Sequence, residues 1–359
     1  MSGFWGNNIK YSIYGESHGN GIGILIDGLP AGLDLDLDEI HNEMDRRRPG
    51  KSSTATSRNE GDNFDILSGY FKNKTTGAPL CILIKNTNTI SGDYAEVKNV
   101  MRPGHADFTG FVKYDGFNDY RGGGHFSGRI TAPLVFAGAV AKQILKAKNI
   151  FITAHISSIG NIKDDDFNPL EIQEENIEIL KAMEIPTLRQ GVAEEMTEEI
   201  LKCRNDKDSI GGSVECAILN VPVGLGEPFF DSVESVLAHL LFSIPAVKGV
   251  EFGTGFKLAT MKGSEANDEY YYDGDVVKTY TNNNGGILGG ITNGMPVIFK
   301  TAIKPTASIS KDQRSINILT KEAATLEVRG RHDPCIVPRA VPVIEAVAAM
   351  AILELLYNK

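Results

Sequence analysis

The sequence predicts a single α+β domain, and three observations support that prediction. Strand-like and helix-like segments do not alternate regularly along the chain, as a doubly wound parallel sheet would require. With 359 residues, of which 42% are hydrophobic, the chain can bury a substantial core. No linker or low-complexity segment divides it, so we expect a single domain over residues 1–359. An internal duplication is an alternative organisation, because the strand–helix–strand pattern of residues 211–261 loosely resembles that of the first half.

Periodicity and end signals predict the individual elements. Runs rich in apolar and β-branched residues predict strands, at residues 9–15, 20–28, 77–86, 150–160, 211–224, 248–261 and 295–303. Helical periodicity predicts helices, at residues 35–48, 130–148, 231–244 and 339–359, with two more within 168–204 on either side of Pro186. An aspartate can cap the first helix and Pro49 ends it, whereas Thr131 and Pro133 mark the start of the second. The most polar stretch, residues 168–208, is expected to be a peripheral helical insertion.

Charge and composition exclude several classes of protein. A formal net charge of −10 provides no overall basic field that would attract nucleic acid or an anionic membrane. The four cysteines form no Cys-x-x-Cys pair, which argues against a zinc ribbon and a disulfide framework. The N-terminal segment MSGFWGNN lacks the features of a signal peptide, and the longest uncharged helical run, residues 130–141, is too short to span a bilayer. We therefore expect a soluble cytoplasmic protein that binds neither nucleic acid nor membranes.

Arginines are concentrated in a few segments that also contain glycine, proline and histidine. The main segments are DRRRPG (45–50), RPGHAD (102–107), RGGGHFSGR (121–129) and RGRHDPC (329–335). Arginine keeps its charge when dehydrated and forms paired hydrogen bonds to carboxylates and phosphates. A chain that groups its arginines in this way is expected to bind a small polyanion. The three glycines at 122–124 would let a ligand approach the backbone closely.

Four histidines lie in polar loops, where histidine can transfer a proton near neutral pH: His18, His105, His125 and His332. The sequence does not match the patterns of nucleotide-binding, metal-binding or nucleophilic-serine sites. RRPGKSST has Asp45 where a Walker A loop needs glycine, and neither GNGIG nor GGILGG has the context of a dinucleotide fingerprint. No HExxH pair indicates a metal site, and no GxSxG elbow indicates a nucleophilic serine.

Seven motifs together resemble the chorismate synthase family. They are GESHG (15–19), DRRRPG (45–50), RPGHAD (102–107), DYRGGG (119–124), GGILGGI (285–291), KPTASI (304–309) and GRHDPC (330–335), in the family's order and spacing over essentially the whole chain. The resemblance implies a β-α-β sandwich of antiparallel sheets around internal helices, usually assembled as a homotetramer. It also implies a carbon–oxygen lyase of the shikimate pathway. Such an enzyme makes chorismate by trans-1,4-elimination of phosphate from 5-enolpyruvylshikimate-3-phosphate and requires reduced FMN (FMNH2).

The resemblance further implies roles for individual residues. His18 would protonate the departing phosphate, and His105 would protonate or balance the reduced flavin near its N1. Asp333, helped by Ser127, would move the proton from flavin N5. The substrate anions, and NADPH where it serves as reductant, would be held by Arg47, Arg48, Arg129 and Arg331. Contacts to FMN would fall on His125, Phe126, Ser127, Pro245, Ala246, Gly289, Lys304, Pro305, Thr306, Ala307, Ser308 and Arg331. No metal is implied, and an external flavin reductase is the alternative to NADPH.

The chain departs from the family pattern in three places. Ser53 stands where many members have arginine, His125-Phe126-Ser127 stands where many have Arg-Ser-Ser, and Pro245 replaces a more usual small or polar residue. None of these changes removes a proposed proton-transfer group. Two other classes would use similar residues. A phosphatase or other hydrolase would need a metal or a nucleophile and no flavin, and a non-catalytic polyanion-binding module would need the arginines alone.

Overall fold

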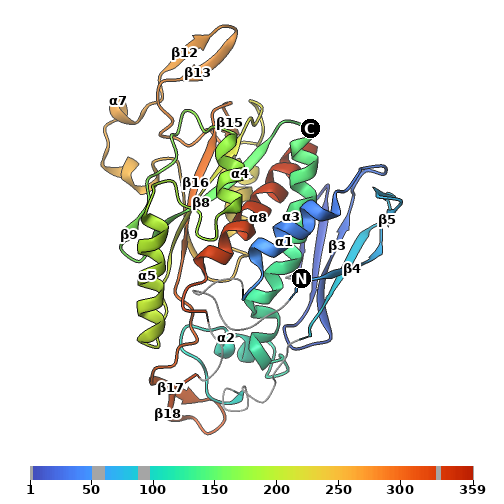
Figure 1. The fold of residues 1–359 in the computed structure, drawn as a ribbon, viewed down its shortest axis with the longest axis vertical. Helices are drawn as coiled ribbons and strands as arrows, with labels where there is room; N and C mark the ends of the chain where they lie inside the picture. The colour runs from blue at the N-terminus through green and yellow to red at the C-terminus, as the bar shows by residue number, and fades with distance from the viewer. Residues whose placement is uncertain (1–2, 51–60, 88–97, 329–332, 359) are drawn as a thin grey trace. The chain divides into compact units, whose positions relative to one another are not determined.

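The computed structural model describes residues 3–50, 61–87, 98–328 and 333–358 (Figure 1). The chain divides into two compact units, each built from segments that are far apart in the sequence. Unit 1 comprises Met1–Phe136, Thr197–Gly211 and Pro305–Arg339, and unit 2 comprises Ala137–Met196, Gly212–Lys304 and Ala340–Lys359. Each unit combines helices with antiparallel sheet, so the predicted α+β class is confirmed. The internal duplication and the insertion at 168–208 stay predictions.

The main sheet in the described part of unit 1 is antiparallel, with strand order β1-β2-β3-β7-β4. The strands are β1 (Phe4–Trp5), β2 (Lys10–Gly15), β3 (Gly21–Asp27), β4 (Phe64–Ser68) and β7 (Leu80–Lys85). Alternate residues of β3 and β7 point to one buried face, where Ile24 and Ile82 lie opposite each other with no exposed surface. The strands predicted at 9–15, 20–28 and 77–86 are therefore confirmed.

Helix α1 (Leu37–Arg47) carries two arginines of the DRRRPG motif. The side chain of Asp36 caps the helix, because its oxygen accepts two backbone N–H groups of the first turn, both at 3.0 Å. The ring of His41 stacks on Phe64 of β4 with their centroids 4.5 Å apart, which holds the helix against the sheet. The helix ends two residues before Pro49, so its arginines lie at the C-terminal end.

Short elements carry the motif loops of unit 1. They are β5 (Tyr70–Phe71), β6 (Lys74–Thr75), α2 (Asp107–Lys113), η3 (Arg121–Phe126), η4 (Gly128–Ile130), β17 (Gln313–Asn317) and β18 (Glu322–Leu326). β5 pairs with β6 and β17 pairs with β18, in both cases as an antiparallel hairpin. The N–H of Met101 donates to the carbonyl oxygen of Ile316 in β17 at 3.2 Å. This hydrogen bond fixes the chain immediately before the RPGHAD motif.

Unit 2 contains a second antiparallel sheet, with strand order β11-β16-β10-β8-β9. The strands are β8 (Phe151–Ile159), β9 (Ile162–Lys163), β10 (Gly212–Leu219), β11 (Val247–Phe252) and β16 (Val297–Ile303). One face packs against α4 (Glu175–Ala182), in a cluster of Phe167, Ile177, Leu180, Ala217, Leu219 and Ile298. The remaining elements are α6 (Val233–Leu241), α7 (Gly263–Ala266), η5 (Phe229–Asp231), η6 (Gly255–Thr260) and the strand pairs β12 (Tyr270–Asp273) with β13 (Val276–Thr279) and β14 (Ile287–Leu288) with β15 (Ile291–Thr292).

Among the described helices, α3 (Thr131–Lys146), α5 (Val192–Asn205) and α8 (Val337–Tyr357) contribute residues to both units. Within unit 2, α3 and α8 pack closely at Gly138, because a Cβ built there would lie 2.2 Å from the Cβ of Ala346 (Figure 1). Beside this contact, Lys142 Nζ lies 2.6 Å from Glu345 Oε2. Helix α8 is long and apolar enough to cross a membrane, but 89% of its most apolar window is buried inside the structure. It is therefore a core helix.

Two details differ from the sequence predictions. The strand predicted at 248–261 ends at Phe252, because Gly253 and Gly255 adopt φ values of 54° and 58° and the chain continues into η6. The closing helix begins at Val337, two residues earlier than predicted. The hairpins β12–β13 and β17–β18 were not predicted, because their residues are largely polar or exposed and lack the apolar runs that mark core strands.

Candidate active site

The three consecutive glycines form a tight turn in unit 1, here called the glycine turn (Gly122–Gly124). Their φ values of 57°, 83° and 53° lie in the left-handed region that favours glycine. The N–H of Ser17, in the GESHG motif, donates to the carbonyl oxygen of Gly124 at 3.1 Å. The hydroxyl of Ser17 lies 3.2 and 3.1 Å from the carbonyl oxygens of Arg121 and Gly122. Two motifs that are far apart in the sequence are thus held together.

The glycine turn lies against both histidines that were predicted to transfer protons. A Cβ built on Gly122 would lie 2.2 Å from Cε1 of His18, and a Cβ built on Gly123 would lie 3.1 Å from Cε1 and Nε2 of His105. The first distance is shorter than real Cβ contacts allow, so any side chain at position 122 would displace the His18 ring. The structure therefore brings His18 and His105 to neighbouring residues of one turn.

His18 is nearly buried, with 8% of its surface exposed. Its Nδ1 lies 3.1 Å from the hydroxyl oxygen of Ser17. Close by, Asp119 accepts two hydrogen bonds from Arg121, both at 2.8 Å. These hydrogen bonds lower the pKa of Asp119, and the charge of His18 adds to the effect. An ionised Asp119 in turn stabilises positive charge on His18 when that ring holds a proton.

His105 is held by residues of its own motif. Its Nδ1 lies 2.7 Å from Oδ1 of Asp107. Arg102, with 4% of its surface exposed, donates to the same carboxylate from Nε and Nη2, both at 2.7 Å. Burial alone would raise the pKa of Asp107, but the hydrogen bonds from Arg102 and His105 outweigh it and lower that pKa well below its usual range. Arg102 also donates from Nη1 to Ser308 Oγ at 3.3 Å, which links RPGHAD to KPTASI.

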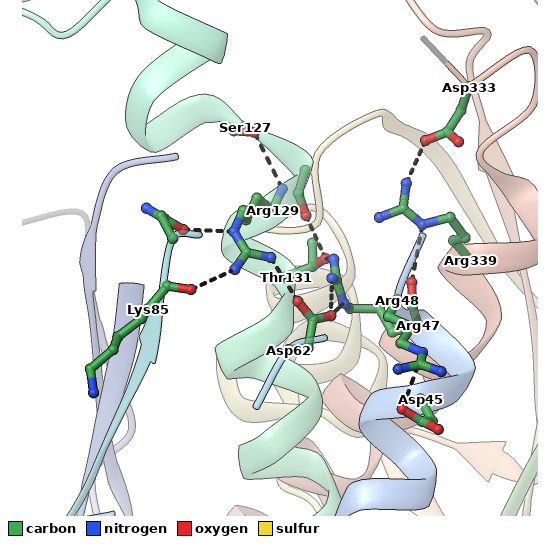
Figure 2. Close-up of polar contacts among 12 residues, drawn as sticks. Asp45, Arg47, Arg48, Asp62, Lys85, Ser127, Arg129, Thr131, Asp333 and Arg339 are labelled. Atoms are coloured by element: carbon green, nitrogen blue, oxygen red, sulfur yellow. Dashed lines mark hydrogen bonds and ion pairs between the residues drawn. The ribbon is translucent and has the colours of Figure 1, made fainter. Parts of the chain in front are cut away.

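Figure 2 shows that two of the arginines predicted to bind substrate anions, Arg47 and Arg129, contact the buried Asp62. Arg47 donates to Asp62 Oδ2 from both Nε, at 3.0 Å, and Nη2. Arg129 donates to Asp62 Oδ1 from Nη1 at 2.7 Å. Burial would raise the pKa of Asp62, but the two guanidinium charges outweigh it and lower that pKa. The two guanidinium groups and the one carboxylate together carry a net charge of +1.

The other nitrogens of these two arginines also have partners in unit 1. Arg47 Nη1 lies 3.4 Å from Thr131 Oγ1, whereas Arg129 donates from Nε to Asn86 Oδ1 at 2.7 Å and from Nη2 to the carbonyl oxygen of Lys85 at 3.4 Å (Figure 2). Arg47 and Arg129 are 1% and 6% exposed. Both guanidinium groups therefore already bind partners within the protein.

A second group of charges lies at the end of α1. The Nε of Arg48 lies 3.3 Å from Asp45 Oδ1, and 30% of the Arg48 side chain is exposed. Arg339 of α8 donates from Nε to the carbonyl oxygen of Arg47 at 3.0 Å and forms an ion pair with Asp333 (Figure 2). Asp333, predicted to move a proton, is thus tied through Arg339 to the C-terminal end of α1, where Arg47 and Arg48 lie.

The residues predicted to contact FMN fall in both units. In unit 1, the exposed His125 has its Nδ1 2.8 Å from the carbonyl oxygen of Gly15, Phe126 packs against Tyr114, and Ser127 Oγ accepts the N–H of Arg129. Ser308 contacts Arg102, as described above. Among the described residues, Thr306 Oγ1 is a buried polar atom with no hydrogen-bond partner, although the Thr306 carbonyl accepts from Ser209. Pro305 and Ala307 flank it and are not buried.

In unit 2, the predicted flavin residues lie on two turns. Lys304 donates its N–H to the carbonyl oxygen of Ala246 at 3.0 Å, which holds Lys304 beside the IPAVKG segment. Pro245, next to Ala246, is exposed. Gly289 has a φ of 63°, and a Cβ built there would meet nothing within 4 Å. These turns therefore offer exposed backbone.

Some residues with predicted roles are not described by the structure, and some residues of the site had no predicted role. Arg331, His332 and Ser53 lie outside the described residues. No role was predicted for Asp62 or Arg102, and Asp107 was predicted only as a neighbour of His105. A signal existed for Arg102 and Asp107, because both belong to the RPGHAD motif. No local signal existed for Asp62, whose partners come from α1 and from η4.

Comparisons with known proteins agree with these motifs. A family model described as chorismate synthase matches residues 9–357. Proteins named chorismate synthase from Dehalococcoides mccartyi (strain BAV1) and Methanocaldococcus jannaschii are 46% and 47% identical to the chain. The alignments cover 99% and 98% of the chain and 96% and 95% of the relatives. A crystal structure of chorismate synthase matches with a TM-score of 0.77 at 30% identity, covering 99% of this chain and 93% of that one.

Proposed function

Because the chain belongs to the chorismate synthase family, we propose that its glycine turn positions His18 and His105 for proton transfer in the family's reaction. That reaction is the elimination of phosphate from 5-enolpyruvylshikimate-3-phosphate to give chorismate. The chain is accordingly a carbon–oxygen lyase of the shikimate pathway with the α+β fold of the family. One observation carries the proposal: neighbouring glycines of one turn lie against the two histidines.

The substrate carries one phosphate and two carboxylates, and the arginines of unit 1 suit these groups. Arg47, Arg129 and Asp62 together keep one net positive charge in a buried place, where electrostatic attraction is strong. We assign the substrate anions to Arg47, Arg48, Arg129 and Arg331. Arg48, which is partly exposed, is the member of this set within the described residues that solvent and ligand reach most directly.

His18 and Asp333 provide proton transfer in this proposal. The leaving phosphate gains negative charge as its C–O bond breaks, so a proton held on the nearly buried His18 stabilises the transition state. The ionised Asp119 nearby supports that proton. Asp333, fixed by its ion pair with Arg339, and Ser127, fixed at the start of η4, would accept and pass on the proton from flavin N5.

The family requires a reduced flavin, and the predicted residues fit such a group. Thr306 Oγ1, which has no partner among the described residues, offers a hydrogen bond to a ligand, and the open surroundings of Gly289 let a planar ring approach the backbone. We propose FMN in its reduced form, held by residues 125–127, 245–246, 289 and 304–308, with Arg331. When bound, reduced FMN supplies electron density for the C–O cleavage and takes up the hydrogen that no ordinary base could remove. His105, whose Cε1 and Nε2 lie next to Gly123, would protonate or balance the reduced flavin.

We also propose a cytoplasmic homotetramer that receives its flavin electrons either from NADPH directly or from an external reductase. Exposed aromatic residues in unit 2 support an assembly: Phe229, Phe230 and Phe256 are 85%, 91% and 83% exposed. The rings of Phe229 and Phe230 lie next to each other, with centroids 6.5 Å apart, and exposed contiguous apolar patches are typical of surfaces that bind another protein.

An anaerobic assay tests the function. The purified chain is given 5-enolpyruvylshikimate-3-phosphate with and without dithionite-reduced FMN, and the chorismate absorbance and released phosphate are followed together. We expect equal amounts of both products, and only with reduced FMN. Phosphate release that leaves the dephosphorylated enolpyruvyl compound would indicate a phosphatase, and binding without turnover would indicate a polyanion-binding module.

A further inference from the structure

We propose that Asp107 is a positioning residue that fixes His105 in the tautomer with its hydrogen on Nδ1, so that Nε2 is the atom presented beside Gly123. The inference rests on the proposed function, in which His105 holds a proton for the reaction. It concerns the chain's own residues, and it can be tested without turnover.

The short contact between His105 and Asp107 decides the tautomer. Nδ1 lies 2.7 Å from Asp107 Oδ1, a distance typical of a charge-assisted hydrogen bond. An ionised carboxylate can only accept hydrogen bonds, so Nδ1 must be the donor. Asp107 remains ionised because Arg102 and His105 lower its pKa against the effect of burial. An Nδ1 without hydrogen would instead set two lone pairs against each other at this distance.

Arg102 prevents the carboxylate of Asp107 from turning away. It donates to Asp107 from its backbone N at 3.1 Å and from Nε and Nη2 at 2.7 Å, so both carboxylate oxygens are held. Nη2 of Arg102 also lies 3.2 Å from Nδ1 of His105. Because that nitrogen has a closer, charged acceptor in Asp107, this longer contact does not compete for Nδ1.

Gly123 lies next to the other nitrogen of the ring. A Cβ at position 123 would lie 3.1 Å from Nε2 and Cε1 of His105, so the glycine backbone is close to the Cε1–Nε2 edge of the ring, whereas Asp107 contacts Nδ1. Arg102 further reaches Ser308 in the segment assigned to the flavin. The same guanidinium therefore sets both the imidazole and the KPTASI segment in position.

The test compares wild-type protein with Asp107→Asn by solid-state NMR after selective ¹⁵N labelling of histidine, with His105→Gln used to assign the signal. In the variant, Arg102 keeps the amide oxygen, which leaves the amide NH₂ facing Nδ1. We expect a protonated Nδ1 in the wild type and a shift to the Nε2–H tautomer in Asp107→Asn. Asp107→Glu should retain the wild-type signature. Asp115→Asn, an exposed change in the same region, is the matched control.

Steady-state assays with reduced FMN give the second readout. We expect kcat of Asp107→Asn to fall by about 10²-fold or more, as expected when a catalytic ring is misplaced, with a much smaller change in KM. Asp107→Glu should recover part of the loss. An unchanged His105 signal in Asp107→Asn, or a changed signal with normal kcat, would overturn the proposal. A wild-type chain that makes no chorismate would reject the proposed function, while the NMR spectra would still decide the tautomer.

Discussion

Gly122 lies directly against the imidazole of His18: a methyl group at its Cα would come within 2.2 Å of Cε1 and 2.3 Å of Nδ1. The same methyl group would lie 2.8 Å from Ser17 Oγ, which itself contacts the histidine ring. Position 122 therefore sets how far the ring of His18 can move toward the backbone. The neighbouring Gly123 limits the ring of His105 in a similar way but less tightly, because a Cβ there would lie 3.1 Å from Cε1 and Nε2.

Gly122→Ala should reduce turnover strongly. The methyl group must push His18 aside, and a displacement of about 1 Å at a catalytic group can cost on the order of 10²-fold in rate. Its φ of 57° adds backbone strain. The measurement is kcat with saturating substrate and reduced FMN, with circular dichroism to verify the fold. Gly128→Ala is the control, because a Cβ there meets nothing within 4 Å. Equal kcat values for the two variants would refute the positional role of Gly122.

Asp62→Asn should destabilise the protein by about 3–5 kcal/mol, because it leaves the buried Arg47 and Arg129 without their counter-charge. The measurement is the free energy of unfolding in urea at pH 7. Asp62 has a lowered pKa, so its contribution is present above the unfolded value of about 3.9 and is lost as pH falls through the folded value. Asp65→Asn, which removes an exposed ion pair with Lys85, should change little. Equal stability of the two variants would contradict this role for Asp62.

Thr306→Val should weaken flavin binding without destabilising the unliganded protein. The valine removes a buried hydroxyl that has no partner among the described residues, and a lost hydrogen bond to FMN corresponds to about a 2- to 10-fold rise in Kd. Thr301→Val is the control, since Thr301 Oγ1 is also buried without a partner but lies in β16. Kd for reduced FMN is measured anaerobically by fluorescence. Wild-type affinity in Thr306→Val would remove this residue from the flavin site.

His155 should make stability depend on pH through the neutral range. In unit 2 it lies between Asp164 and Glu215, 3.0 and 2.9 Å from its two nitrogens. Burial would lower the pKa of His155, but these hydrogen bonds raise it. The resulting stability is complete below the unfolded pKa of about 6.5 and is lost as pH rises through the folded value.

The corresponding measurement is urea unfolding of the wild type and His155→Gln from pH 6 to pH 9. The difference in unfolding free energy between them should be largest at pH 6 and shrink as pH rises. His239→Gln, an exposed change in α6, should follow the wild type. A constant difference across this range would show that His155 is not charged in the folded protein.

The main elements were predictable because their signals are local. The cap at Asp36, the stop at Pro49 and the apolar alternation of β3 and β7 each depend on residues close together in the sequence. The hairpins β12–β13 and β17–β18 escaped prediction because exposed strands carry little apolar pattern. The division into two units was not predictable from local periodicity either, because each unit combines segments that are far apart in the sequence.

The candidate site was predictable only in part. The motifs predicted roles for His18, His105 and the arginines, and these roles stay predictions. They did not predict that both histidines lie against one glycine turn, since that depends on tertiary contacts. Asp62 gave no signal, because its role comes from two arginines distant in the chain. Arg47 and Arg129 were predicted to hold substrate, and in the structure both already form ion pairs with Asp62.

The most direct test of the central claim is single-turnover formation of chorismate by wild type, His18→Ala and His105→Ala with reduced FMN under anaerobic conditions. We predict that each variant folds normally, binds the substrate, and forms chorismate at least about 10²-fold more slowly, in line with the loss of a general acid or base. Near-normal rates in both variants would contradict the claim that the glycine turn positions two catalytic histidines.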